Sequence, residues 1–151
     1  MKYIHTNIIA NDWKKLSGFY QKTFYCQPIL PERNLVGDWI DKLTNIEDVH
    51  VRGIHLQLPG YENDGPTLEI FQYNKQPEKI EQKINRPGFA HIAFRVGNVK
   101  GYLNKIIENG GSRYGDLVKK KIEGMGTIEV VYACDPEGNI IELQAWEKGS
   151  D

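Results

Sequence analysis

Residues 3–24 read YIHTNIIANDWKKLSGFYQKTF and predict a strand followed by a helix. The stretch from Tyr3 to Ile9 is typical of a short strand, and Asn11 or Asp12 then offers a side chain that can cap a helix. Apolar residues after this cap recur at spacings of three and four, which indicates one buried helix face: Trp13, Leu16, Tyr20 and Phe24. A strand–helix unit therefore opens the chain.

The same unit returns in the second half of the chain. Phe89 to Val96 is typical of a strand, and Asn98 is the next helix cap. Glycine accepts the left-handed conformation that ends helices, so the sequence Asn-Gly-Gly at 109–111 predicts the end of this helix. The apolar stripe between cap and end consists of Val99, Tyr102, Leu103, Ile106 and Ile107. The repeat of strand, cap and helix indicates two related modules.

Three strand-like runs follow each strand–helix unit. They span about 27–36, 49–58 and 66–73 in the first half, and about 113–121, 127–134 and 139–146 in the second. The sequence therefore predicts an α+β fold: two βαβββ modules, at about 1–74 and 88–148, whose curved mixed sheets enclose a cavity within one domain, 1–151. A polar segment, 74–88, joins the modules, and an extra piece at 38–48 predicts a short helix in the first.

Composition narrows the class of protein. The chain has 151 residues with a formal net charge of −1, and no basic run indicates a nucleic-acid or membrane partner. The N-terminus lacks the apolar core of a secretory signal, and no window approaches a membrane span, so we expect a cytoplasmic protein. The only two cysteines, Cys26 and Cys134, form no zinc-binding pattern, and two reduced thiols are the simpler interpretation.

Because side chains alternate along a strand, the His and Glu residues of the predicted strands lie on one face of each sheet. Side chains of a strand point to alternate faces, and every predicted strand has one aliphatic face suited to packing under a helix. The opposite face mixes aromatic residues with one His or Glu. His5 and His91 occupy equivalent places in the first strands of the two modules, as do Glu69 and Glu142 in the last strands. A single such residue is most often a solvated side chain, but four at equivalent positions predict a divalent metal site for zinc, nickel, cobalt or manganese.

These residues give the chain a family resemblance. It resembles the vicinal oxygen chelate superfamily, which includes glyoxalase I, methylmalonyl-CoA epimerase, extradiol dioxygenases and fosfomycin or bleomycin resistance proteins. The resemblance covers nearly the whole chain and rests on residues 3–24, on TLEIF at 67–71, on GFAHIAFRV at 88–96 and most specifically on DPEGNIIEL at 135–143. The resemblance implies paired βαβββ modules around one divalent metal ion bound by His5, Glu69, His91 and Glu142. Glu69 resembles the glyoxalase I pattern, because a Gln more often fills this place in the epimerase.

The resemblance also implies a reaction at a carbon next to a carbonyl. The metal would polarise two neighbouring substrate oxygens, and Glu142 or Glu69 would move the proton on the adjacent carbon. A basic residue one turn of strand beyond the first His often binds the glutathione carboxylate in the glyoxalase family, but Ile9 stands there in this chain. The expected substrate pocket is lined by Phe71, Tyr73, Phe89, Arg95, His55 and Trp146.

Three classes of function follow from these expectations. The first is a glyoxalase-like or epimerase-like lyase or isomerase. The second is an Fe(II) dioxygenase, although such sites typically use two His and one Glu, and Glu69 would be a fourth ligand. The third is a small-molecule binding or resistance protein of the same fold, which would have no need of four metal ligands. We expect a small-molecule substrate and a homodimer, because members of the family pair modules either within a chain or across two chains.

Overall fold

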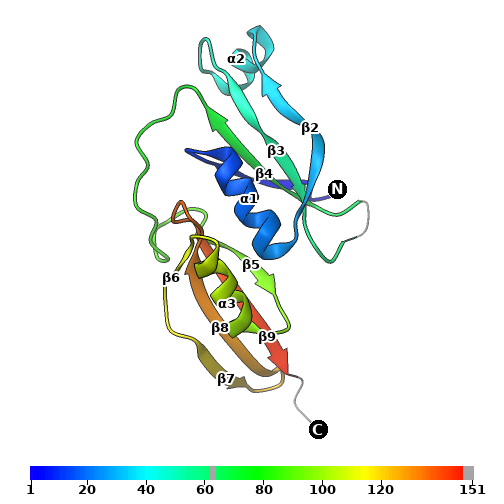
Figure 1. The fold of residues 1–151 in the computed structure, drawn as a ribbon, viewed down its shortest axis with the longest axis vertical. Helices are drawn as coiled ribbons and strands as arrows, with labels where there is room; N and C mark the ends of the chain where they lie inside the picture. The colour runs from blue at the N-terminus through cyan, green and yellow to red at the C-terminus, as the bar shows by residue number, and fades with distance from the viewer. Residues whose placement is uncertain (62–63, 148–151) are drawn as a thin grey trace. The chain divides into compact units, whose positions relative to one another are not determined.

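The computed structural model describes residues 1–61 and 64–147 and consists of two compact units, Met1–Lys79 and Ile80–Asp151. The unit boundary falls inside the polar segment 74–88 that the sequence analysis assigned to a linker. The predicted module end at residue 148 lies outside the described residues. Each unit contains one mixed sheet with a long helix against it (Figure 1). The predicted α+β class is therefore confirmed.

The sheet of the first unit has the strand order β1-β4-β3-β2. β1 runs parallel to β4, whereas β3 is antiparallel to both of its neighbours, β4 and β2. The strands are β1 (His5–Ile9), β2 (Gln27–Leu35), β3 (Val51–Gln57) and β4 (Thr67–Tyr73). The parallel pairing of the first strand with the last puts His5, on the edge strand β1, and Glu69, on the neighbouring β4, on the same open face of the sheet.

The sheet of the second unit repeats this order as β5-β9-β8-β6, with β7 also paired to β8. Its strands are β5 (His91–Arg95), β6 (Ser112–Arg113), β7 (Val118–Ile122), β8 (Gly126–Cys134) and β9 (Ile140–Glu147). The single strand predicted at 113–121 is wrong, because the structure divides it into β6 and β7. Arg113 donates hydrogen bonds to the Gly115 carbonyl and the Asp116 carboxylate, and these bonds close a bulge between the two short strands.

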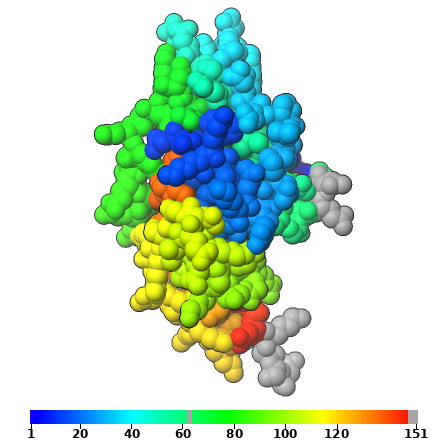
Figure 2. All heavy atoms as spheres, viewed as in Figure 1, coloured from blue at the N-terminus to red at the C-terminus, as the bar shows by residue number. Residues whose placement is uncertain are grey.

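The predicted caps and apolar stripes place the two long helices, with one exception. The Asp12 side chain accepts a hydrogen bond from the Lys15 amide at 3.0 Å and begins α1 (Trp13–Phe24), and Asn98 caps α3 (Val99–Glu108) in the same way. α1 packs against β3 and β4 of the first sheet, and Figure 2 shows its atoms, in blue, at the surface of this unit. Ile107, predicted in the buried stripe of α3, is half exposed, because the apolar face of this helix is centred on Val99, Leu103 and Ile106.

The extra piece of the first module forms the predicted short helix, α2 (Asp38–Thr44). Its Ile40 packs with Val49 and Val51 in a buried cluster, against which further half-buried apolar side chains lie: Leu35, Ile46, Phe71 and Tyr73. Val51 and Phe71 stand on the same face of the sheet as His55 and Glu69, because paired residues of neighbouring strands share a face. The α2 segment therefore closes one end of the open face of the sheet.

The two cysteines are free thiols, one in each unit. Cys26 is buried, and burial raises the pKa of its thiol to about 12. This shift keeps the thiol protonated at neutral pH and makes it a poor nucleophile. Within residues 1–61 and 64–147, no helix is long and apolar enough to cross a membrane.

Candidate metal centre

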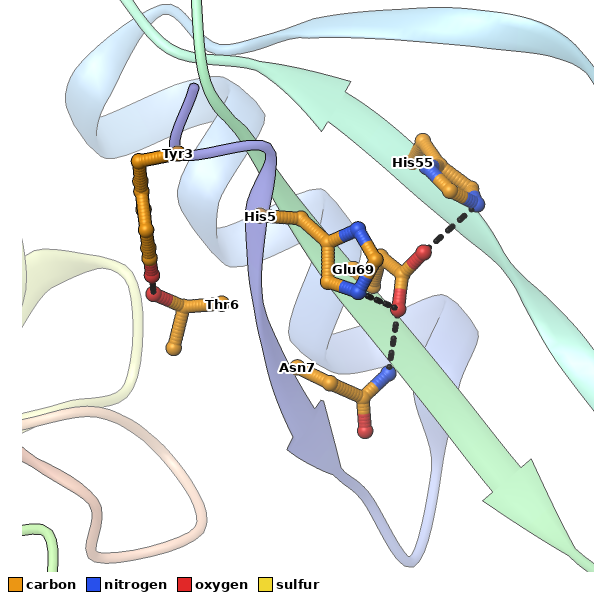
Figure 3. A network of polar contacts seen from close by, with 6 residues as sticks. All are labelled: Tyr3, His5, Thr6, Asn7, His55 and Glu69. Atoms are coloured by element: carbon orange, nitrogen blue, oxygen red, sulfur yellow. Dashed lines mark hydrogen bonds and ion pairs between the residues drawn. The ribbon is translucent and has the colours of Figure 1, made fainter. Parts of the chain in front are cut away.

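In the first unit, the two strands on either side of β4, β1 and β3, direct polar side chains at the carboxylate of Glu69 (Figure 3). His5 Nε2 lies 3.4 Å from Glu69 Oε2, and the Asn7 amide donates a hydrogen bond to the same oxygen at 3.0 Å. His55 Nε2 lies 3.0 Å from the other oxygen, Oε1. The Glu69 side chain is 9% exposed, so its charge is held by these contacts in a largely buried position.

His55 is fixed by its surroundings as well as by Glu69. Its ring meets the Phe71 ring edge-on at 5.7 Å between centroids and the His5 ring at 6.2 Å. Burial lowers the pKa of His55 below its ordinary value, the Glu69 carboxylate opposes this effect, and the charges of Arg33 and His5 add to it. A neutral imidazole at this place donates one N–H to the carboxylate.

In the second unit, the corresponding pair is His91 and Glu142, with 3.5 Å between His91 Nε2 and Glu142 Oε2. The Gln144 amide donates to Glu142 Oε1 at 2.9 Å, and the Trp146 indole donates in turn to the Gln144 carbonyl oxygen. Tyr132 stands directly opposite Glu142 in the pairing of β8 with β9, and its ring centroid lies 5.2 Å from that of His91. Burial raises the pKa of Tyr132, and the hydrogen bond to Glu142 and its charge raise it further, so the phenol keeps its proton.

The remaining residues of the predicted pocket fall in different places. Tyr73 lines a cavity of about 350 Å³ at the α2 end of the first sheet, together with Ile9, Ile46 and residues 75–79. Arg95, which is exposed, and Trp146 line a cavity of about 420 Å³ in the second unit. Phe89 lies before the first residue of β5 and is exposed. Phe71 and His55 stand beside Glu69, as described above.

The donor set of the two pairs fits a divalent metal. Each pair offers an imidazole nitrogen beside a carboxylate oxygen, the ligand types that zinc, nickel, cobalt and manganese accept. Across residues 1–61 and 64–147, however, no three His, Cys, Asp or Glu side chains are grouped so that they could hold a metal ion. In the first unit, His5 and His55 approach different oxygens of Glu69. Each unit by itself therefore offers two of the four predicted ligands.

Sequence reasoning did not identify Asn7, Tyr132 and Gln144 as partners of the two carboxylates. Alternation placed Asn7 on the same face as His5, and this signal was available in the sequence. Tyr132 depends on the register between β8 and β9, in which it stands directly opposite Glu142. The register of two strands follows from turn geometry and packing, so the sequence of one strand does not predict it.

Comparisons with known proteins identify the family and the fold of the chain. The model of the glyoxalase/bleomycin resistance protein/dioxygenase superfamily matches residues 2–143. No curated protein matches the chain significantly by sequence. Among solved structures, a glyoxalase family protein from Bacillus cereus aligns with a TM-score of 0.73 at 17% identity, over 97% of this chain and 93% of that one.

A second similar structure is the genomically encoded fosfomycin resistance protein FosX from Listeria monocytogenes, with a TM-score of 0.60, 19% identity and coverage of 97% of this chain and 93% of that one. A variant of FosX, complexed with Mn(II) and 1S,2S-dihydroxypropylphosphonic acid, aligns at 0.57 and 17% identity, over 94% of this chain and 90% of that one. At these identities the structures support the fold, and the family model extends over nearly the whole chain. The chain belongs to the glyoxalase/bleomycin resistance protein/dioxygenase superfamily.

Proposed function

We propose that this protein is a metal-dependent, glyoxalase-like isomerase or lyase that moves a proton at a carbon next to a carbonyl of a small substrate. The observation that carries the proposal is the pair of equivalent His–Glu contacts, one in each unit, at 3.4 and 3.5 Å. A carboxylate beside an imidazole at corresponding places of two related sheets supplies four donors of suitable chemistry. Membership of a superfamily that includes glyoxalases supports the same activity.

His5, Glu69, His91 and Glu142 would hold one divalent ion, within one chain or between the modules of two chains. A bound divalent metal acts as a Lewis acid that stabilises negative charge on the substrate oxygens. Zinc, nickel, cobalt and manganese remain the candidates, and the manganese complex of FosX is an example from the same fold.

The environments of the two glutamates favour different roles. Glu69 accepts a hydrogen bond from the Asn7 amide on the neighbouring strand, whereas the residue paired with Glu142 on its own neighbouring strand is Ala93, which has no side-chain donor. The Glu142 side chain is also more exposed, at 16% against 9%. We assign proton transfer to Glu142, which abstracts the proton from the substrate carbon and returns it, and the role of fixed ligand to Glu69.

The cavity at the α2 end of the first sheet supports a substrate without glutathione. Ile9, Ile46 and Tyr73 are the apolar residues that line this cavity, and Lys75 and Lys79 line it as well. Ile9 stands where glutathione-dependent relatives are expected to carry a basic residue. An isoleucine cannot compensate a carboxylate, because a charged group that leaves water needs a partner, so a glutathione carboxylate in this cavity would depend on Lys75 or Lys79 instead. A small-molecule substrate, a homodimeric state and a location in the cytoplasm complete the proposal, and dimerisation is tested by gel filtration of the dilute protein.

Metal content and hydrogen exchange test the proposed activity. Elemental analysis of protein dialysed against each metal in turn should give one equivalent per four-residue set, with an increase in thermal stability. The metal-loaded protein should then exchange the C–H next to the carbonyl of hydroxyacetone or acetoin in D2O, followed by proton NMR. Less than a tenth of an equivalent of every metal would refute the proposal. One equivalent of metal without exchange of either compound would favour a binding or resistance protein.

A further inference from the structure

His55 and Tyr132 occupy the same place in the two sheets. His55 stands directly opposite Glu69 in the pairing of β3 with β4, and Tyr132 stands directly opposite Glu142 in the pairing of β8 with β9. Side chains directly opposite each other in an antiparallel pair have Cβ atoms about 4.5–5.5 Å apart and lie on one face. Each carboxylate is therefore flanked by the His of the first strand on one side and by His55 or Tyr132 on the other.

The contacts at Glu69 divide its two oxygens between two sides. His55 occupies Oε1 at 3.0 Å, while Oε2 lies toward His5 and accepts the Asn7 hydrogen bond. A carboxylate that is held at one oxygen cannot rotate freely about its terminal bond. The oxygen that faces His5 is thus kept in place, and Figure 3 shows both contacts from the same viewpoint.

The position of the His55 ring has its own support. Phe71 packs edge-on against it, and the Phe71 ring occupies space that a side chain at residue 53 would fill. An added Cβ at Gly53 would overlap Phe71 Cδ1 and the Ile70 carbonyl oxygen. The glycine therefore lets the aromatic ring lie over β3, from where it holds the imidazole beside Glu69.

We propose that His55 and Tyr132 are positioning residues, which orient the carboxylates of Glu69 and Glu142 for the metal without binding it themselves. The inference rests on the proposed function, since it assumes that both carboxylates are metal ligands. It adds His55, which contacts Glu69 Oε1 at 3.0 Å, and Tyr132, which stands directly opposite Glu142 in the strand pairing. The partners that hydrogen-bond to metal-binding side chains typically contribute about 10–100-fold to metal affinity.

Two substitutions at His55 separate positioning from direct binding. In His55→Phe the new ring fills similar space but offers no donor, whereas in His55→Gln an amide N–H is placed at a similar reach. We expect the Mn²⁺ affinity of His55→Phe, measured by calorimetry on the metal-free protein, to fall about 10–100-fold. That of His55→Gln should stay within about threefold of the unsubstituted protein, because the hydrogen bond to Glu69 is retained.

Matched controls come from the same units. His50 hydrogen-bonds to Asn34 and has no contact with Glu69 in the structure, so His50→Gln should leave Mn²⁺ affinity unchanged. Tyr132→Phe removes only the hydroxyl next to Glu142 and should weaken binding, whereas Tyr114→Phe, at an exposed tyrosine, should not. The melting temperature of each metal-free variant distinguishes a loss of affinity from a loss of folding. Should His55→Phe fail to fold, the pair Tyr132→Phe and Tyr114→Phe decides the question.

Three results would overturn the inference. Unchanged Mn²⁺ affinity in folded His55→Phe and in Tyr132→Phe would show that neither residue positions a ligand. Equal losses in His55→Gln and His55→Phe would show that the imidazole itself is needed, as for a direct ligand. An unsubstituted protein that binds no divalent metal would refute the proposed function together with this inference, whereas the first two results leave the proposed function intact.

Discussion

The two sheets share one backbone arrangement but surround their glutamates with different side chains. Two residues after the first histidine, the first unit has Asn7 where the second has Ala93, and opposite the glutamate it has His55 where the second has Tyr132. Two residues farther along the last strand, Phe71 faces a glycine in the first unit, whereas Gln144 faces Val130 in the second. Strand register makes these positions equivalent in the two sheets, whereas the side chain at each position determines its chemistry.

This difference shows how a repeated module can carry two roles. Glu69 is held by the Asn7 amide and by His55, and it is the less exposed of the two carboxylates. Glu142 accepts a hydrogen bond from Gln144 of its own strand and has Tyr132 directly opposite it on β8. A metal site that also transfers protons needs both a fixed ligand and a carboxylate that can leave the ion, since coordination favours the deprotonated form. In the proposed function, Glu69 is the fixed ligand and Glu142 is the carboxylate that leaves the ion.

The largest difference between the two units is expected when the charge of each glutamate is removed in turn. Glu142→Gln keeps one coordinating oxygen but accepts no proton at neutral pH, so C–H exchange of hydroxyacetone should fall by about 10²–10⁴-fold. Glu69→Gln should be the milder change, because it alters a ligand and not the base. Both rates are measured by proton NMR in D2O with metal content held equal. Faster exchange in Glu142→Gln than in Glu69→Gln would reverse the assignment, and undiminished exchange in both would exclude proton transfer by these carboxylates.

The second comparison removes one imidazole from each unit. His5→Ala and His91→Ala should each weaken metal binding by about 100-fold or more, since a methyl group cannot replace a nitrogen ligand at about 2.0–2.1 Å. Equal losses are expected, because one centre needs donors from both modules. Metal per chain after dialysis, measured by elemental analysis, checks this expectation. His50→Ala is the control, and a variant at position 5 or 91 that keeps its full metal content would show that the two pairs do not form one centre.

The sequence was sufficient for the repeated features of the fold but not for the contacts between strands. Caps such as Asp12 and the spacing of apolar residues predicted α1 and α3, because these signals lie within one segment. The faces of the strands also followed from alternation, which placed His5 and Glu69 on one side of the first sheet. The division of 113–121 into β6 and β7 was missed, since the bulge depends on hydrogen bonds of Arg113 to residues that follow it.

The same limit applies to the side-chain contacts within the candidate site. His55 was predicted as a pocket residue, but its contact with Glu69 requires the register of β3 against β4. Tyr132 was missed altogether for the corresponding reason in the second unit. The short helix α2 was predicted from residues 38–48, but its packing through Ile40 against Val49 and Val51 depends on contacts in three dimensions.

The third comparison concerns the position four residues after each first histidine, where the first unit has Ile9 and the second has Arg95. Ile9 supplies no cation for a glutathione carboxylate, so the hemithioacetal of methylglyoxal and glutathione should be a poor substrate. We expect kcat/KM for this adduct below about 10⁴ M⁻¹s⁻¹, the lower end of the usual range for enzymes acting on their own substrates. Formation of the thioester, followed by its ultraviolet absorbance, measures the rate. An efficiency within the usual range would show that another residue binds the glutathione carboxylates.

The smallest effect is expected at Gly53, where the first unit has no side chain and the second has Val130. In Gly53→Ala the new Cβ would overlap the Ile70 carbonyl oxygen, and because this contact is with backbone, the strands must shift. Overpacking of this kind costs about 1–3 kcal/mol of unfolding free energy, which lowers Tm by about 2–4 °C per kcal/mol in a chain of this size. Val130→Ala only shortens a half-buried side chain and should cost about 1 kcal/mol or less. Thermal unfolding of the two metal-free variants measures both costs.

Because the added Cβ also displaces Phe71 from His55, Gly53→Ala should weaken Mn²⁺ binding as well, whereas Val130→Ala should leave it unchanged. Equal stability and equal metal affinity in the two variants would show that the space at Gly53 is not needed to hold His55 in place.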